Sequence, residues 1–94
     1  MTKEELLTQL EELADRLNIK VQHESLKNED PTTFGGYCRS EDQHIIIYHS
    51  KASVSRKIEI FTDALRRFDL DDLFVKPEVR ELLKTENIPV ATRN

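Results

Sequence analysis

The sequence predicts an α+β fold in which two amphipathic helices pack on a small three-stranded sheet. Two long segments carry apolar residues at helical spacing, and between them lie a Gly pair and a run rich in β-branched residues. The chain has 94 residues, too few to bury two independent cores. We therefore expect a single domain over residues 1–94, with the order helix, strand, β-hairpin, helix and a short C-terminal helix.

The first helix is predicted at residues 2–17. Thr2 and Glu5 have the spacing of a capping box, in which each side chain binds the backbone N–H of the other residue. The apolar residues that follow form one stripe at helical spacing: Leu6, Leu7, Leu10, Leu13, Ala14 and Leu17. Alternation of apolar and polar residues then predicts a half-buried strand at 19–22. The polar stretch 25–34 has almost nothing to bury, and we expect a mobile loop there.

A β-hairpin is predicted after Gly35-Gly36, a pair that tolerates positive φ or a close backbone approach. Its strands are residues 37–40 and 43–48, with Glu41-Asp42 as the two-residue turn. This turn predicts the cross-strand pairs: Arg39 with His44, Cys38 with Ile45, and Tyr37 with Ile46. The run Ile45-Ile46-Ile47 puts apolar side chains on both faces, which predicts a central strand covered on both sides. The expected strand order is first, third, second.

The second long helix is predicted at residues 54–68, with Ser53 as its N-cap. Its apolar stripe consists of Val54, Ile58, Phe61, Leu65 and Phe68. The charged residues of its polar face are spaced to form ion pairs within the helix: Arg56 with Glu59, and Asp63 with Arg67. Pro77 suits the first position of the last helix, and the tail 86–94 is expected to fray.

Composition and charge exclude several classes of protein. The longest apolar run, 45–48, is far shorter than the roughly 20 residues that span a bilayer, and the N-terminus is an acidic helix rather than a signal peptide. A single cysteine, Cys38, cannot form an internal disulfide, which is typical of a reducing compartment. The net charge of −4 argues against general nucleic-acid binding. We expect a cytoplasmic protein without a membrane partner.

The residues that could carry chemistry are one cysteine and three histidines: Cys38, His23, His44 and His49. Alternation along a strand points His44 and His49 to opposite faces, and Cys38 and His44 also diverge in the predicted register. We therefore expect no metal site, no cofactor and no catalytic residue, with Cys38 buried against Ile45 and the histidines solvated. The alternative is a small enzyme that uses Cys38 with a histidine, or a cryptic metal-dependent hydrolase.

Three segments follow one another as helix end, strand and Gly-containing hairpin: Leu17-Asn18-Ile19-Lys20-Val21, Gly35-Gly36-Tyr37 and Ile45-Ile46-Ile47-Tyr48. This order resembles the N-terminal half of ImmA/IrrE-type minimal metallopeptidase domains, over roughly residues 5–68. In that family the helix after the hairpin carries a zinc-binding His-Glu-x-x-His motif. Asp63, Ala64 and Arg67 stand at those positions here. The resemblance therefore implies a scaffold without zinc.

A second resemblance covers more of the chain. It involves the segments 35–39, 68–74 and 77–83, which look like those of small uncharacterised bacterial proteins. This resemblance implies a bacterial source and brings no known activity.

We predict a non-enzymatic protein-interaction or regulatory module that binds a protein partner or a second copy of itself. One candidate surface is an exposed sheet edge, at the short strand that carries Arg39. The other is the segment 69–80, which has more apolar area than one short turn can easily bury. Its candidate residues are Leu70, Leu73, Phe74, Val75 and Arg80. The alternative is that the four apolar side chains only dock the last helix.

Overall fold

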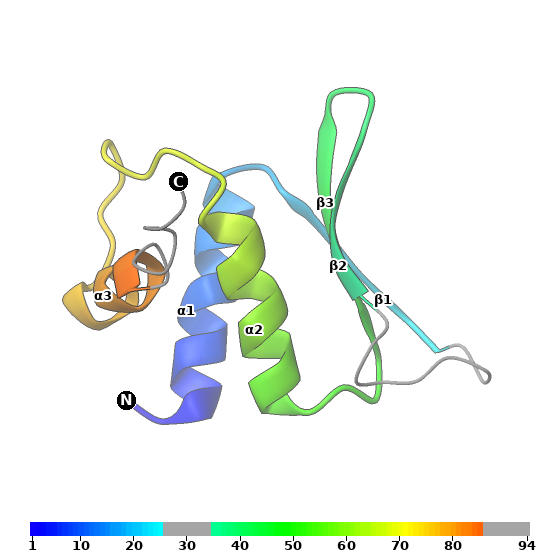
Figure 1. Ribbon diagram of the computed structural model, residues 1–94, viewed down its shortest axis with the longest axis horizontal. Coiled ribbons are helices and arrows are strands. Elements are labelled where there is room, and N and C mark those ends of the chain that lie inside the picture. Colours follow the sequence, from blue (N-terminus) through cyan, green and yellow to red (C-terminus); the bar gives the residue numbers. More distant parts are fainter. Residues whose placement is uncertain (26–34, 86–94) are drawn as a thin grey trace.

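The computed structural model describes residues 1–25 and 35–85. Its elements, in chain order, are α1 Lys3–Arg16, β1 Lys20–Glu24, β2 Gly35–Ser40, β3 Gln43–His49, α2 Val54–Leu65 and α3 Pro77–Thr85 (Figure 1). This order confirms the predicted α+β fold. The loop expected after Ser25 and the frayed tail expected at 86–94 lie outside the described residues.

The three strands form one mixed sheet with the order β1-β3-β2, as predicted. β2 runs antiparallel to β3, and the hairpin has the predicted register: Tyr37 pairs with Ile46, Cys38 with Ile45 and Arg39 with His44. Glu41 adopts a φ of 55° in the two-residue turn, because tight hairpin turns need positive φ to match the twist of their strands. β1 runs parallel to β3, with Val21 beside Ile46.

Gly35 lies at a point where a larger residue does not fit. Its φ is 131°, and a Cβ atom added to it would lie 2.8 Å from the carbonyl oxygen of Ile47 and 3.0 Å from Cδ1 of Ile60. Ile47 belongs to β3 and Ile60 to α2, so the missing side chain lets the start of β2 lie close to both elements. The close backbone approach predicted for the Gly pair is therefore confirmed at Gly35.

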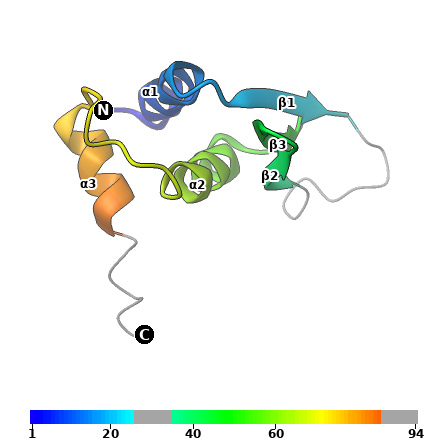
Figure 2. The same cartoon turned by 90° about the horizontal axis from the view of Figure 1, so that it is seen from above.

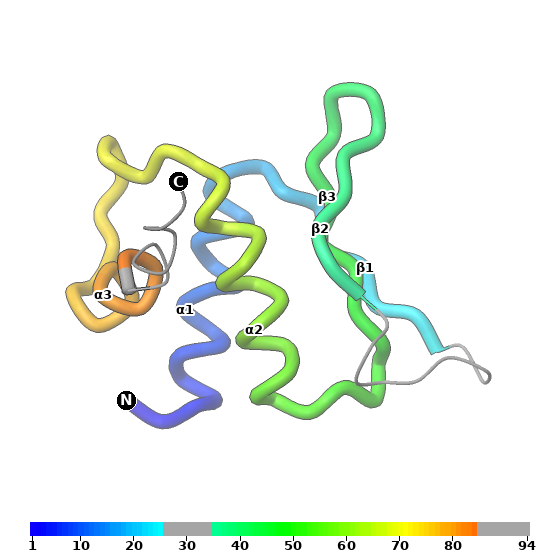
Figure 3. Tube along the Cα trace, in the orientation of Figure 1, coloured from blue at the N-terminus to red at the C-terminus, as the bar shows by residue number. Residues whose placement is uncertain are grey.

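The described helices lie on one side of the sheet (Figure 2). α2 packs against β2 and β3, and α1 packs against α2 and β1. The segment 66–76 then passes from the end of α2 to α3 (Figure 3). α3 packs against α1 and α2 on the side away from the sheet. The molecule therefore has the sheet and α3 on opposite sides of a central helix pair.

Both long helices begin at the predicted caps. The Thr2 hydroxyl accepts a hydrogen bond from the Glu5 backbone N–H at 3.1 Å, and the Glu5 carboxylate accepts one from the Thr2 N–H at 2.8 Å. At the start of α2, the Ser53 hydroxyl accepts a bond from the Arg56 N–H at 3.1 Å. The predicted ion pairs of α2 also form: Arg56 with Glu59 at 3.2 Å and Arg67 with Asp63 at 3.4 Å.

The hydrophobic core lies between the helices and the inner face of the sheet, which is the face toward α1 and α2. Its largest fully buried side chains come from the helix pair and β3: Phe61, Leu10, Ile46 and Leu65. Of the apolar stripe predicted for the second long helix, Phe61 and Leu65 are buried in this core, and Val54, Ile58 and Phe68 are partly buried against it.

The prediction that β3 is covered on both sides is wrong. Ile46 is fully buried on the inner face, whereas Ile45 and Ile47 are only half-buried on the outer face. Within residues 1–25 and 35–85, no helix lies on that outer side. Gly36, which pairs with Ile47, contributes no side chain to cover it. The two outer isoleucines are therefore partly exposed.

α2 ends at Leu65, and not at Phe68 as predicted. Beyond Leu65 the backbone N–H groups of Arg67 and Phe68 bond three residues back, to Ala64 and Leu65, each at 3.1 Å. Such bonds tighten and close the last turn of a helix. The turn brings the Phe68 ring to the hairpin, where it meets His44 edge-on with 4.9 Å between ring centres. α2 therefore ends just before Phe68 packs on the sheet, although the apolar residues continue at helical spacing as far as Phe68.

Candidate interaction surface

The segment 74–76 leads into α3 in a non-helical conformation. Pro77 disfavours helical backbone in the residue before it and favours an extended chain, in which successive side chains alternate in direction. Val75 is buried, whereas Phe74 and Lys76 are exposed. Alternation therefore places one apolar side chain of this segment in the core and leaves its neighbour at the surface.

Phe74 has the most exposed large apolar side chain in the described part of the protein. Its exposed fraction is 72%, compared with 47% for Met1 and 36% for Val21. Its ring thus adds little to the buried core. Exposed aromatic side chains of this kind often anchor a binding partner, because burying them on association removes a large apolar area from water.

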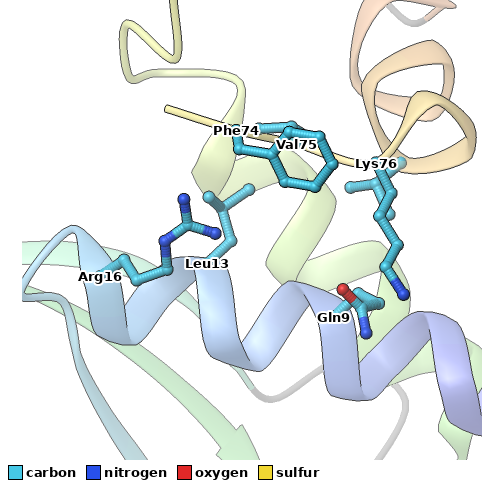
Figure 4. Close-up of a pocket in the computed structure, with 7 residues that line it drawn as sticks. Gln9, Leu13, Arg16, Phe74, Val75 and Lys76 are labelled. Atoms are coloured by element: carbon cyan, nitrogen blue, oxygen red, sulfur yellow. The ribbon is translucent and has the colours of Figure 1, made fainter. Parts of the chain in front are cut away.

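A small hollow lies between Phe74 and α1 (Figure 4). It measures about 30 Å³ and is lined by Gln9, Leu13, Arg16, Phe74, Val75, Lys76 and Val79. We call these seven residues the Phe74 surface. Leu13, Val75 and Val79 are buried and form an apolar floor. The arrangement is an apolar depression with an exposed aromatic ring beside it.

Two cations flank the ring in Figure 4, Arg16 from α1 and Lys76 from the segment before α3. Neither side chain makes a hydrogen bond or an ion pair with any residue that the structure describes. The pKa of Glu5 is lowered mainly by its hydrogen bond with the Thr2 backbone, and the charge of Lys76 lowers it further. The lining residues of the Phe74 surface include two cations and no carboxylate, although Arg16 also lines a neighbouring hollow with Glu12 and Asp15.

Most of the side chains predicted in segment 69–80 hold the structure together. Leu70 and Leu73 are half-buried and pack against the core, and Val75 is buried within it. Arg80 donates a hydrogen bond from Nη2 to the carbonyl oxygen of Leu73 at 3.1 Å, which ties α3 to the preceding turn. These residues therefore fit the alternative in which segment 69–80 only docks the last helix, whereas Phe74 is exposed.

Arg39 lies elsewhere, at the hairpin tip. Its Nε donates to the carbonyl oxygen of Glu41 at 3.1 Å, and Nη2 lies 4.0 Å from Asp42. The hairpin and α3 are on opposite sides of the helix pair (Figure 1). The predicted residues thus occupy two separate places. Among the described strands β2 is an edge strand, as expected for the one that carries Arg39.

The prediction that Cys38 is buried is wrong, because its side chain is exposed. It pairs with Ile45 in the predicted register, but both residues lie on the outer face, away from the helices. His49 also departs from expectation, since it is buried with 3% exposed. Its Nδ1 accepts a hydrogen bond from the Lys51 backbone N–H at 3.0 Å.

The remaining histidines make aromatic contacts. His23 stacks on Tyr48 with 5.9 Å between ring centres, and His44 lies beside Tyr37 on the inner face. Cys38 is on the outer face, so the register places it on the opposite side of the sheet from His44. Across residues 1–25 and 35–85, no group of three Cys, His, Asp or Glu side chains is placed to hold a metal ion.

The α2 positions that correspond to His-Glu-x-x-His serve other purposes here. Asp63 is exposed and pairs with Arg67, which lies in the turn after α2. Ala64, at the position of the glutamate, is fully buried in the core. A larger polar side chain at position 64 would have to displace packed apolar groups.

No described helix combines the length and the apolar character needed to cross a membrane. Comparison with protein-family models, curated proteins and solved structures gives no match to this chain.

Three residues of the Phe74 surface lie outside the predicted segment 69–80: Gln9, Leu13 and Arg16. Their spacing along α1 was a signal that they share one face. Lys76 and Val79 lie within that segment but were not among its candidate residues. Nothing in the sequence indicated that Phe74 would lie beside that face of α1.

Proposed function

We propose that this protein is a non-enzymatic interaction module and that it binds a partner protein through the Phe74 surface. The observation that carries the proposal is the 72% exposure of Phe74 beside an apolar depression. A monomer gains nothing in stability from an aromatic ring in water, whereas a bound partner would bury that ring.

The alternative that the protein is an enzyme has no supporting observation comparable to the exposure of Phe74. Nucleophilic catalysis by Cys38 needs an adjacent base, and its cross-strand partner is Ile45. Metal-dependent hydrolysis needs a set of ligands, and the described residues supply none. Elemental analysis separates the readings, because about one zinc ion per chain surviving dialysis against a mild chelator would favour the hydrolase.

The proposal extends to origin and location. What supports a zinc-less relative of the ImmA/IrrE-type scaffold is the order helix, strand, hairpin, helix, together with Asp63, Ala64 and Arg67 at the motif positions. A bacterial source rests on the resemblance to small bacterial proteins. A cytoplasmic location rests on the single cysteine.

Affinity capture followed by reconstitution tests the function. Tagged wild-type protein, Phe74→Asp and Lys20→Asp would be used as baits, and Lys20→Asp is the control because Lys20 is exposed on β1. A partner of the Phe74 surface should be retained by wild type and Lys20→Asp and lost with Phe74→Asp. With the purified partner, Phe74→Ala should raise Kd by roughly 30-fold, which corresponds to about 2 kcal/mol.

Two results would contradict the proposal. One is a set of captured proteins that is the same for wild type and Phe74→Asp. The other is turnover of a small molecule by the purified protein, if Phe74→Asp leaves that turnover unchanged.

A further inference from the structure

We infer that the Phe74 surface binds a peptide segment of a partner protein in which an apolar side chain is flanked by carboxylates. This inference rests on the proposed function and names the chemistry of its partner.

The apolar side chain of the proposed partner is inferred from the shape of the Phe74 surface. The hollow of about 30 Å³ has room for about one water molecule, so it is too small to enclose a partner's side chain. A partner must therefore lie against the exposed face of the Phe74 ring, with only a small group reaching the floor at Leu13 and Val79. An apolar side chain can make that contact without leaving a polar group unpaired.

The carboxylates of the proposed partner are inferred from Arg16 and Lys76. They lie on opposite sides of the Phe74 ring, and neither has a hydrogen-bond or ion-pair partner among the described residues. Carboxylates on either side of a docked apolar side chain would pair with both. Because Arg16 lies in the last turn of α1, the helix dipole favours a cation there. Lys76 lies at the start of α3, where the dipole does not favour a cation.

A nucleic acid suits the surface less well. Two separated cations neutralise few phosphates, and the net charge of −4 repels a polyanion at long range. A short acidic peptide carries its few charges next to an apolar group, which matches the order of cation, ring and cation in Figure 4. Glu12 and Asp15 are exposed and line a hollow on α1 together with Arg16, and they would limit the carboxylates of the partner to the immediate surroundings of Phe74.

Selection from a phage-displayed library of random dodecapeptides tests the inference without knowledge of the natural partner. Peptides would be selected on wild-type protein and counter-selected on Phe74→Ala. We expect the surviving sequences to be enriched in Asp or Glu next to Leu, Ile, Phe or Trp. A parallel selection on the Arg16→Glu/Lys76→Glu double variant should shift this enrichment to Lys and Arg, because the flanking charges are reversed.

One selected peptide, synthesised with a fluorescent label, then gives the affinities. Arg16→Gln and Lys76→Gln together should raise its Kd roughly three- to tenfold, and so should raising NaCl from about 50 to 300 mM. Lys20→Gln is the matched control, an exposed cation on β1, and should leave Kd unchanged. Circular dichroism of each variant verifies that the fold is intact.

These results test the acidic peptide partner separately from the proposed interaction function. If no selected peptide depends on Phe74, the peptide partner is rejected, and capture with Phe74→Asp then decides the interaction function. If Phe74-dependent peptides show no acidic enrichment and bind equally at low and high salt, the interaction function stands and the acidic partner is rejected. Self-association that is seen by light scattering and is lost in Phe74→Asp would identify a second copy as the occupant and also reject the peptide partner.

Discussion

The hydroxyl oxygen of Tyr37 lies 2.5 Å from Nδ1 of His44, and the two rings stack with 5.8 Å between their centres. The residues are diagonal neighbours on the inner face of the hairpin. Phe68 meets the His44 ring from the end of α2, and the Arg67 guanidinium sits 4.9 Å from the centre of the Tyr37 ring. These contacts tie the hairpin to the segment that closes α2.

Tyr37→Phe tests this connection. The change removes the hydroxyl and keeps the ring, so Nδ1 of His44 loses its partner while the aromatic contacts remain. We expect the free energy of unfolding in urea to fall by about 0.5–1.5 kcal/mol with an unchanged m value. In a double-mutant cycle with His44→Phe, additive effects of the two changes would show that the hydrogen bond contributes nothing.

Two Phe→Ala substitutions form a matched pair. Phe61 is fully buried, whereas Phe74 is 72% exposed. Phe61→Ala should lower the free energy of unfolding by about 3–5 kcal/mol, because it leaves a cavity in the core. Phe74→Ala should change it by about 0.5 kcal/mol or less. Similar losses in the two urea titrations would place Phe74 in the core and remove the basis of the proposed function.

The capping box makes stability depend on pH. The pKa of Glu5 is lowered from its ordinary value of 4.5, mainly by its hydrogen bond with the Thr2 backbone. A lowered folded-state pKa contributes stability that is present above about pH 4.5 and is lost as pH falls through the folded value. Wild type and Glu5→Gln should therefore differ in unfolding free energy at pH 7, and the difference should shrink as pH falls below about 4.5 through the lowered folded-state pKa. Parallel pH curves would show that the carboxylate does not act as a cap.

Cys38 should react with a thiol reagent at nearly the same rate in native protein and in urea. The side chain is exposed on the outer face of β2, so unfolding uncovers nothing that limits access. Labelling with a chromogenic disulfide at pH 8 measures both rates, and Cys38→Ser supplies the blank. A native rate about a hundredfold below the rate in urea would mean that the thiol is covered.

Local signals predicted the elements well. The capping box at Thr2 and Glu5 specifies the start of α1 through neighbouring residues alone. The hairpin register follows from turn length, since a two-residue turn at Glu41-Asp42 leaves one pairing of the strands. Both depend on contacts within a few residues, which a sequence displays directly.

The features that were predicted wrongly or missed all depend on contacts between distant parts of the chain. The exposure of Cys38 depends on which side of the sheet the helices occupy, and alternation along a strand does not reveal this. The end of α2 involves Phe68 meeting His44. The Phe74 surface exists because the segment before α3 crosses α1 at Leu13 and Arg16, a juxtaposition that spacing in either segment alone cannot show.

The parallel pairing of β1 with β3 bears on the kinetics of folding. The hairpin closes over two turn residues, whereas Val21 can reach Ile46 only after a long stretch of chain is brought back on itself. Closing the longer stretch costs more entropy and gives no reward until β3 is in place. We therefore expect the hairpin and α2 to assemble in the folding transition state and β1 to join afterwards. Substitutions at Val21 should then speed unfolding more than they slow refolding.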